Sequence, residues 1–321
     1  MVTIFTAPYH GYQVLFSPFE RNKIAFTGAV NYGISGNGAL LIYERDEVGY
    51  KEFRRYPWKD GLFDVTWSEL NEAVLVTASG DGSVVIYDQA QPHGPVTVFT
   101  GHTAEVSSVH WSTTRQEQLV ISASWDGTVR LWDPNAQVCV AMFTEHAGLV
   151  YTAVWSPHIP HTFASVSGDG TIRLWDSSAP PNSTASVNAN CGEVLSCDWS
   201  KYNEYLLFTG GVDCAVKLWD IRQLGAPLHL LMGHGQAVRR VRASPHDPNI
   251  IASCSYDFTV RLWNIGTGQL GGGLLDIIAH HTEFTYGLDF SLHDPGMIAD
   301  CSWDQTIKLL TPVSIAPKPA V

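Results

Sequence analysis

The chain has 321 residues, of which 45% are hydrophobic and only 16% are charged, and its formal net charge at pH 7 is −12. Such an acidic chain does not suit a nucleic-acid backbone, which needs clustered Lys and Arg, but it would attract a basic partner. No apolar run approaches the ~20 residues of a membrane-spanning helix, and the first residues lack the features of a secretory signal. We therefore expect a cytosolic (cytoplasmic) protein whose six cysteines stay reduced.

One short string recurs along the chain, and each copy joins a turn to a strand-like run. It reads SGNGALLIYE at 35–44, SGDGSVVIYD at 79–88, SWDGTVRLWD at 124–133, SGDGTIRLWD at 167–176, GVDCAVKLWD at 211–220, SYDFTVRLWN at 255–264 and SWDQTIKLLT at 302–311. The turn residues are Asn37, Asp81, Asp126, Asp169, Asp213, Asp257 and Asp304. Their spacing of about 43 to 47 residues fits the four-stranded blades of a propeller.

A second marker is a His before an alternating apolar run, as in GHTAEVSSVHW (101–111) and HHTEFTYGLDF (280–290). Each repeat therefore predicts an inner strand, a middle strand, the Asp turn, a third strand and an outer strand. The pattern resembles the WD-repeat family and predicts an all-β, seven-bladed β-propeller over residues 1–321. The run VTIFT (2–6) has no blade of its own, so we expect it to complete the last blade and close the ring.

Three repeats carry a His, a Ser, an Asp and a Trp at matching positions, a set that includes the residues of a Ser-His-Asp nucleophile. The sets are His102, Ser122, Asp126 and Trp132; His146, Ser165, Asp169 and Trp175; and His234, Ser253, Asp257 and Trp263. An enzyme has no use for three identical triads, so we interpret the sets as structural. In the WD-repeat family these positions form a hydrogen-bonded tetrad, which pairs polar groups that are buried.

Other repeats depart from this pattern. Trp58 or Asn190 stands at the His position in two repeats, and Leu310 replaces the Trp of the seventh. We expect those blades to be less stable. The sequence contains no phosphate loop, nucleophile elbow or paired metal-ligand spacing, so we expect no enzyme activity, no cofactor and no metal.

Three positions per repeat are expected to face outward at the narrow top of the ring: three and five residues after the marker His, and just before the turn Asp. They are His10 and Tyr12; Phe63, with Asp64 beside it; Glu105, Ser107 and Trp125; Leu149 and Tyr151; Glu193, Leu195 and Val212; Arg239 and Tyr256; and Phe284, Tyr286 and Trp303. An apolar ring with aromatic residues has the composition of an interface centre and suits an amphipathic helix. The alternative is that the aromatic residues only close the mouth of the channel.

Longer segments give a closer resemblance. The strings DGLFDVTWSE (60–69), SCDWSKYNEYLLFTG (196–210), ASCSYDFTVRLWN (252–264), HHTEFTYGLDFS (280–291) and ADCSWDQTIKL (299–309) resemble the peroxin-7 family. Its members are WD-repeat receptors for the type-2 peroxisomal targeting signal. The resemblance implies a cytosolic import receptor that shuttles to the peroxisome and captures enzymes such as thiolase. It also implies two further partners: a co-receptor peroxin (the long form of peroxin-5 or its fungal equivalent) and the peroxisomal docking machinery.

In that family the signal is an N-terminal peptide with a basic and an aliphatic residue, five variable residues, then His or Gln and Leu or Ala. In a helix these side chains fall on one face. The resemblance implies that the peptide binds the top face. Candidates to contact its basic residue are Asp64, Glu105 and Glu193, and candidates for apolar contacts are Trp125, Tyr151, Leu195, Tyr256, Phe284, Tyr286 and Trp303.

Two other functions are open at this point. KLWDIR at 217–222 matches the Trp-Asp-x-Arg ending of substrate adaptors of cullin-type ubiquitin ligases, in which Arg222 would be needed for the contact. An enzymatic propeller would need a cluster of acids or histidines that binds a metal in the channel.

Overall fold

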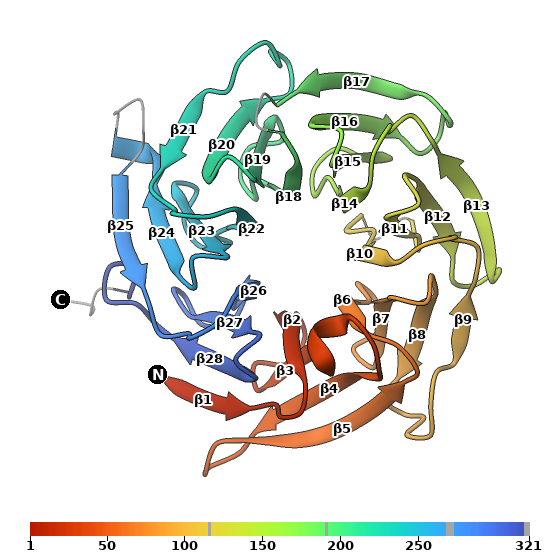
Figure 1. Cartoon of the computed structure of the whole chain (residues 1–321), viewed down its shortest axis with the longest axis vertical. Coiled ribbons are helices and arrows are strands. Elements are labelled where there is room, and N and C mark those ends of the chain that lie inside the picture. The colour runs from red at the N-terminus through yellow and green to blue at the C-terminus, as the bar shows by residue number, and fades with distance from the viewer. Residues whose placement is uncertain (115–116, 190–191, 268–272, 318–321) are drawn as a thin grey trace.

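The computed structural model describes residues 1–114, 117–189, 192–267 and 273–317. Its strands form seven antiparallel sheets of four strands each, arranged around a central axis (Figure 1). Within these ranges the helical segments are two 3-10 turns, η1 (Asn31–Gly33) and η2 (Ile265–Thr267). The predicted seven-bladed β-propeller is confirmed. None of the described helical segments has the length and apolarity needed to cross a membrane.

Each sheet is one blade, with its first strand nearest the axis. Blades 1 to 3 consist of β2 (His10–Phe16), β3 (Lys23–Ala29), β4 (Gly38–Arg45) and β5 (Tyr50–Trp58); β6 (Leu62–Trp67), β7 (Val74–Ser79), β8 (Val84–Asp88) and β9 (Thr97–Phe99); and β10 (Val106–Trp111), β11 (Val120–Ser124), β12 (Val129–Asp133) and β13 (Val138–Phe143). Blades 4 to 6 consist of β14 (Val150–Trp155), β15 (Thr162–Ser167), β16 (Thr171–Asp176) and β17 (Ser183–Asn188); β18 (Val194–Trp199), β19 (Leu206–Gly211), β20 (Ala215–Asp220) and β21 (His229–Met232); and β22 (Val238–Ala243), β23 (Ile250–Ser255), β24 (Val260–Asn264) and β25 (Gly273–Ile278). Blade 7 combines β26 (Thr285–Phe290), β27 (Ile298–Ser302) and β28 (Thr306–Leu310) with β1 (Val2–Phe5).

The ring closes through the N-terminal strand. β1 pairs antiparallel with β28, from Val2 opposite Leu309 to Phe5 opposite Thr306. Figure 1 shows β1 as the outer strand of a blade whose other strands come from the C-terminal end of the chain. The closure expected from the VTIFT run is confirmed. It gives β28 a neighbour on both sides, so that its backbone edge is not left open to another chain.

The repeated Asp shapes the turn between the middle and third strands. In blade 3, Asp126 Oδ1 accepts hydrogen bonds from the backbone N–H and the hydroxyl of Thr128, at 2.9 and 2.7 Å. Gly127 lies between them with a φ of +83°, a left-handed conformation that glycine adopts without steric cost. The turn holds the preceding residue, Trp125, at the end of the blade.

The core lies between neighbouring blades, because side chains alternate between the two faces of each sheet. One cluster joins Val76 and Val84 of blade 2 to Val106 and Trp132 of blade 3. The fully buried tryptophans are Trp132, Trp175, Trp199, Trp219 and Trp263. Apolar packing between blades therefore holds each inner strand, and the loops at its ends, in a fixed position.

Three blades contain the same buried polar network. In blade 3, Ser122 Oγ lies 2.7 Å from His102 Nε2 and accepts a bond of 2.8 Å from Trp132 Nε1, while His102 Nδ1 lies 2.8 Å from Asp126. The matching bonds join His146, Ser165, Asp169 and Trp175 in blade 4, and His234, Ser253, Asp257 and Trp263 in blade 6. Burial lowers the pKa of His102, so the neutral ring donates through Nδ1 and accepts from the serine through Nε2. The fully buried serines cannot approach a substrate.

Blades 2 and 5 use other donors. The indole N–H of Trp58 donates to Ser79 Oγ at 2.9 Å in blade 2. In blade 5, Lys217 forms an ion pair of 2.8 Å with the turn residue Asp213. Asn190, which the sequence places at the His position of blade 5, lies outside the described residues. Other polar contacts thus tie the turns of these blades to the strands.

Replacing Ser165 by Ala is expected to lower the free energy of unfolding by about 1–3 kcal/mol, because it removes the partner of both His146 Nε2 and Trp175 Nε1 in the interior. Urea denaturation of the variant and the wild type measures the difference. Ser35→Ala, on an exposed loop, serves as the control. Equal midpoints for Ser165→Ala and the wild type would show that the network adds nothing to stability.

Candidate functional site

A cavity of about 320 Å³ lies at the ends of the blades where the chain enters the inner strands. We call it the aromatic pocket. Its lining residues are Tyr12, Tyr32, Gly33, Ile34, Phe63, Glu105, Ser107, Trp125, Tyr151, Leu195, Arg239, Tyr256, Tyr286 and Trp303. The inner strands run from this pocket toward a second cavity: in β10, Ser107 lines the first, and Ser108 and His110 line the second.

Most of the predicted peptide-binding residues meet in this pocket. Those that line it are Glu105, Trp125, Tyr151, Leu195, Tyr256, Tyr286 and Trp303. Two others lie beside it. The hydroxyl of Tyr151 donates to Glu193 Oε2 at 2.7 Å, and the ring of Phe284 lies 4.9 Å from that of Tyr256 and 5.3 Å from that of Trp303.

The aromatic side chains support one another without a ligand. The rings of Tyr286 and Trp303 are stacked, with centroids 5.0 Å apart and an interplanar angle of 10°. The hydroxyls of Tyr256 and Tyr286 lie 3.1 Å apart, and Tyr12 contacts both Tyr286 and Phe63, at 4.9 and 4.8 Å between ring centroids. The pocket is therefore preformed, which reduces the entropy lost when a ligand binds.

One polar group in this aromatic cluster lacks a partner. The indole Nε1–H of Trp303 is buried, and no acceptor for it is present among the described residues. Most buried donors in proteins are paired.

Sequence reasoning missed the part of the pocket that comes from the connection between β3 and β4. Tyr32, Gly33 and Ile34 line the pocket, and Figure 1 shows this connection close to the inner ends of blades 1 and 2. The Tyr32 ring stacks on His10 with centroids 3.9 Å apart, and its carbonyl accepts a bond of 2.7 Å from Tyr12. The string NYGISGNG (31–38) does carry a signal, since it places an aromatic and an aliphatic residue among turn formers.

The pocket has opposite charges on opposite sides of the ring. Glu105 comes from blade 3 and is half-buried; among the described residues its carboxylate has no cation within ion-pair distance. Arg239 comes from blade 6 and is buried, with its guanidinium 4.9 Å above the ring of Tyr286. Burial and the bond to Glu193 raise the pKa of Tyr151, so its phenol stays protonated and keeps donating.

Exposed apolar side chains stand at the same ends of blades 3, 4 and 5. Trp125, Leu149 and Val212 are 39%, 38% and 41% exposed, and each stands at one of the positions predicted to face outward. The other predicted positions that are buried are His10, Tyr12, Phe63, Ser107, Leu195 and Arg239. His10 packs under Tyr32, and Phe63 packs against Tyr12. The rim thus continues the apolar lining to the surface.

The prediction that Asp64 faces the pocket is wrong. Asp64 is buried and lines the second cavity, where it accepts a bond of 3.1 Å from Val109 N and lies 3.4 Å from Arg240. Successive residues of a strand point to opposite sides, so Phe63 faces the aromatic pocket and Asp64 faces away from it. Its carboxylate joins the inner strands of blades 2 and 3, as Asp198 does for Ala243 in blade 6.

Several known proteins align with most of this chain. The peroxisomal targeting signal 2 receptor of Homo sapiens is 52% identical over 279 residues, which cover 87% of this chain and 85% of that protein. The chain belongs to the family of peroxisomal targeting signal 2 receptors. The receptor of Saccharomyces cerevisiae is 31% identical, covering 88% of this chain and 91% of its own, and peroxisome biogenesis protein 7 of Arabidopsis thaliana is 44% identical, covering 89% and 90%.

Family models agree with the fold of this receptor family. One described as WD domain, G-beta repeat matches residues 93–133, and one described as EIPR1 beta-propeller matches residues 135–263. The resemblance to the peroxin-7 family is confirmed. The human and yeast relatives are named as receptors, and the fold is a WD-repeat propeller.

The ligase-adaptor alternative gains no support from the geometry. Arg222 donates to the carboxylate of Asp220 at 3.0 and 2.7 Å and lies 4.2 Å above the ring of Tyr205. Its guanidinium is thus already bound within its own blade. Family membership favours a targeting receptor instead.

Proposed function

We propose that this chain binds the helical N-terminal type-2 peroxisomal targeting signal of cargo enzymes in the aromatic pocket and delivers the cargo to the peroxisome with a co-receptor peroxin. The observation that carries the proposal is the combination of a preformed aromatic pocket with the carboxylate of Glu105 at its side. An amphipathic helix that carries a basic residue matches both features. The cargo includes enzymes such as thiolase.

The apolar face of the signal helix packs against Trp125, Tyr256, Tyr286 and Trp303. Aromatic residues of this kind dominate binding energies at interfaces, where they are enriched among the residues that cost most when truncated.

The two charges of the pocket define a direction for the peptide. The basic residue of the signal lies near its N-terminus, so it meets Glu105 on blade 3. The C-terminal end of the helix then points across the ring toward Arg239 on blade 6. A cation stabilises this end, because the carbonyl dipoles of a helix sum to a partial negative charge there.

The further partners follow from the same proposal. The co-receptor, which is the long form of peroxin-5 or its fungal equivalent, covers the exposed apolar rim formed by Leu149 and Val212. Phe284 and Glu193 lie next to the pocket and contact either the cargo or the co-receptor. The complex moves from the cytosol to the peroxisomal docking machinery.

Trp125→Gly tests the apolar half of this site. Glycine occupies the matching position in blades 2 and 4, as Gly80 and Gly168, so the turn accepts it. Loss of an anchor tryptophan is expected to cost about 2 kcal/mol, or roughly 30-fold in Kd. Fluorescence anisotropy of a labelled peptide with the thiolase signal measures the change.

The control is Tyr202→Gly, which removes an exposed aromatic residue from the turn at the far end of an inner strand, after β18. It is expected to leave the Kd of the peptide unchanged. The proposed function is wrong if the wild type does not bind the peptide at all. If Trp125→Gly binds as tightly as the wild type, the peptide site does not include the aromatic pocket.

A further inference from the structure

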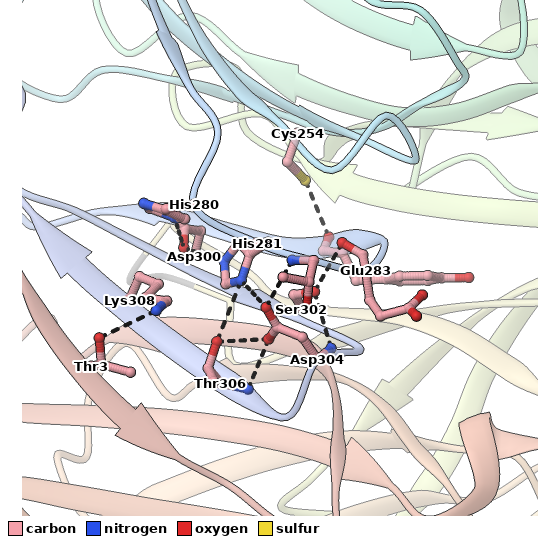
Figure 2. A network of polar contacts seen from close by, with 12 residues as sticks. Thr3, Cys254, His280, His281, Glu283, Asp300, Ser302, Asp304, Thr306 and Lys308 are labelled. Atoms are coloured by element: carbon pink, nitrogen blue, oxygen red, sulfur yellow. Dashed lines mark hydrogen bonds and ion pairs between the residues drawn. The ribbon is translucent and has the colours of Figure 1, made fainter.

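A second polar cluster lies in blade 7, and none of its residues lines the aromatic pocket. Figure 2 shows His280 and His281, which precede β26, next to Asp300 on β27. His281 Nε2 lies 2.7 Å from Asp300 Oδ1, and His280 Nε2 lies 2.9 and 3.0 Å from the two carboxylate oxygens. One atom from each of these three residues lies within 4.8 Å of the others.

Three positions of blade 7 differ together from the complete tetrads. His280, Asp300 and Leu310 stand where blades 3 and 6 have a Gly, a Ser and a Trp. The matching residues are Gly101, Ser122 and Trp132 in blade 3, and Gly233, Ser253 and Trp263 in blade 6.

The space around these glycines is limited by two side chains. A Cβ on Gly101 would lie 2.7 Å from Arg130 Nη1 and 3.2 Å from the ring of Trp132, and a Cβ on Gly233 would lie 2.6 Å from Arg261 Nη1 and 3.1 Å from the ring of Trp263. Blade 4 has Glu145 at this position although it keeps Trp175, and blade 7 has Lys308 and Leu310 where blade 3 has Arg130 and Trp132. The exchange converts a Ser-centred tetrad into two imidazoles that converge on one carboxylate.

This donor set has the chemistry of a transition-metal site. Imidazole nitrogen and carboxylate oxygen are the ligands that zinc takes together in proteins. Asp304 supplies the outer partner that such histidines usually have: its Oδ2 lies 2.7 Å from His281 Nδ1, and its Oδ1 accepts bonds from Thr306 at 2.6 and 3.0 Å (Figure 2). With a proton on Nδ1 directed to Asp304, a metal bound to Nε2 of His281 would replace the proton that Nε2 donates to Asp300.

The cluster is mostly buried and contains two carboxylates. The side chains of Asp300 and His281 are fully buried, and the two carboxylates bring two negative charges into the blade. Burial would lower the pKa of His281, but its hydrogen bonds to Asp300 and Asp304 raise it to about 9, so without an ion its protonated ring balances one of these charges, and a bound cation would take the place of its proton. Lys308 stands opposite Asp300 on β28, but its ammonium lies 3.3 Å from the hydroxyl of Thr3. His280 is 12% exposed and gives an ion a route from solvent.

We propose that His280, His281 and Asp300 bind one divalent transition-metal ion, for which zinc fits the ligands best. The ion would join the loop before β26 to β27, within the blade that β1 completes. The sequence predicts no metal because it has no paired metal-ligand spacing. These ligands do not form such a motif, since Asp300 lies 20 residues after His280 and 19 after His281, on a different segment.

The test uses the full-length protein after treatment with EDTA and removal of the chelator. Titration with Co²⁺, followed by visible absorption, and with Zn²⁺, followed by calorimetry, is expected to give one site per chain. Zn²⁺ is also expected to raise the melting temperature, because it binds the folded state. His280→Gly, which restores the residue of blades 3 and 6, is expected to weaken binding at least tenfold and to abolish the thermal shift.

Two further variants sharpen the result. Asp300→Ser restores the tetrad serine and is expected to lose binding, and His93→Gly, which removes an exposed histidine elsewhere, is expected to bind Co²⁺ as the wild type does. If His280→Gly melts at a lower temperature but Zn²⁺ shifts neither it nor the wild type, the cluster is only a hydrogen-bonded brace. That outcome, or equal Co²⁺ affinity of the wild type and His280→Gly, overturns the proposal.

Discussion

Deletion of residues 1–8 is expected to lower the free energy of unfolding by about 3–5 kcal/mol. The protein would lose the burial of one large apolar side chain and several backbone hydrogen bonds between strands. The deletion removes β1, whose Ile4 is buried in a cluster with Ile307, Leu309 and Tyr43. It also removes the bond of 2.9 Å between Thr6 N and Gln305 O. Urea denaturation, and aggregation at a fixed temperature, measure the effect, because the freed edge of β28 can pair with other chains.

The control for this deletion is removal of residues 317–321, which follow the last strand of the seventh sheet. Its melting temperature is expected to stay close to that of the wild type. Equal melting temperatures for the two truncations would contradict the closure of the ring by β1. A large loss of stability from the N-terminal deletion alone would agree with it.

Glu105→Lys is expected to weaken binding of the signal peptide at least about 100-fold, because it replaces an attraction to the basic residue by a repulsion. Glu105 has no cation within ion-pair distance in the described part of the chain, so its replacement breaks no internal salt bridge. The melting temperature is therefore expected to change little. Anisotropy titrations in low and high salt measure both the affinity and its electrostatic part.

Two variants separate charge from shape. Glu105→Gln keeps the size of the side chain and is expected to bind with an affinity between those of the wild type and Glu105→Lys. Glu72→Lys makes the same charge reversal on an exposed turn at the other end of a blade, before β7, and is expected to bind normally. If Glu72→Lys weakens binding as much as Glu105→Lys, the effect comes from net charge and not from a contact.

The fold can be predicted from the sequence because the same pattern of residues recurs in each blade. Each Asp turn specifies one hairpin, and the spacing of seven turns specifies the ring. The top-face positions followed from the same register, which is why Trp125, Tyr256 and Trp303 were placed at one end of the blades. The residue before the Asp differs from blade to blade, which indicates that the blade does not need a particular side chain there in order to fold.

The remaining parts depended on information that the repeat does not carry. Asp64 was placed wrongly because a step of one residue along an inner strand reverses the side that it faces. Tyr32 and Ile34 lie in a connection with left-handed backbone at Asn31 and Tyr32, which no periodicity predicts. The grouping of His280 with Asp300 depends on how the segment before β26 packs beside β27, which the repeat does not specify.

A charge swap between receptor and peptide tests the proposed site most directly. The basic residue of the signal peptide is replaced by Glu, and the Kd of this peptide is measured for the wild type and for Glu105→Lys. The proposed contact predicts that Glu105→Lys binds the swapped peptide at least about tenfold more tightly than it binds the original one, while the wild type shows the opposite preference. If Glu105→Lys binds both peptides equally weakly, the basic residue of the signal does not meet Glu105, and the proposed placement of the helix in the aromatic pocket is wrong.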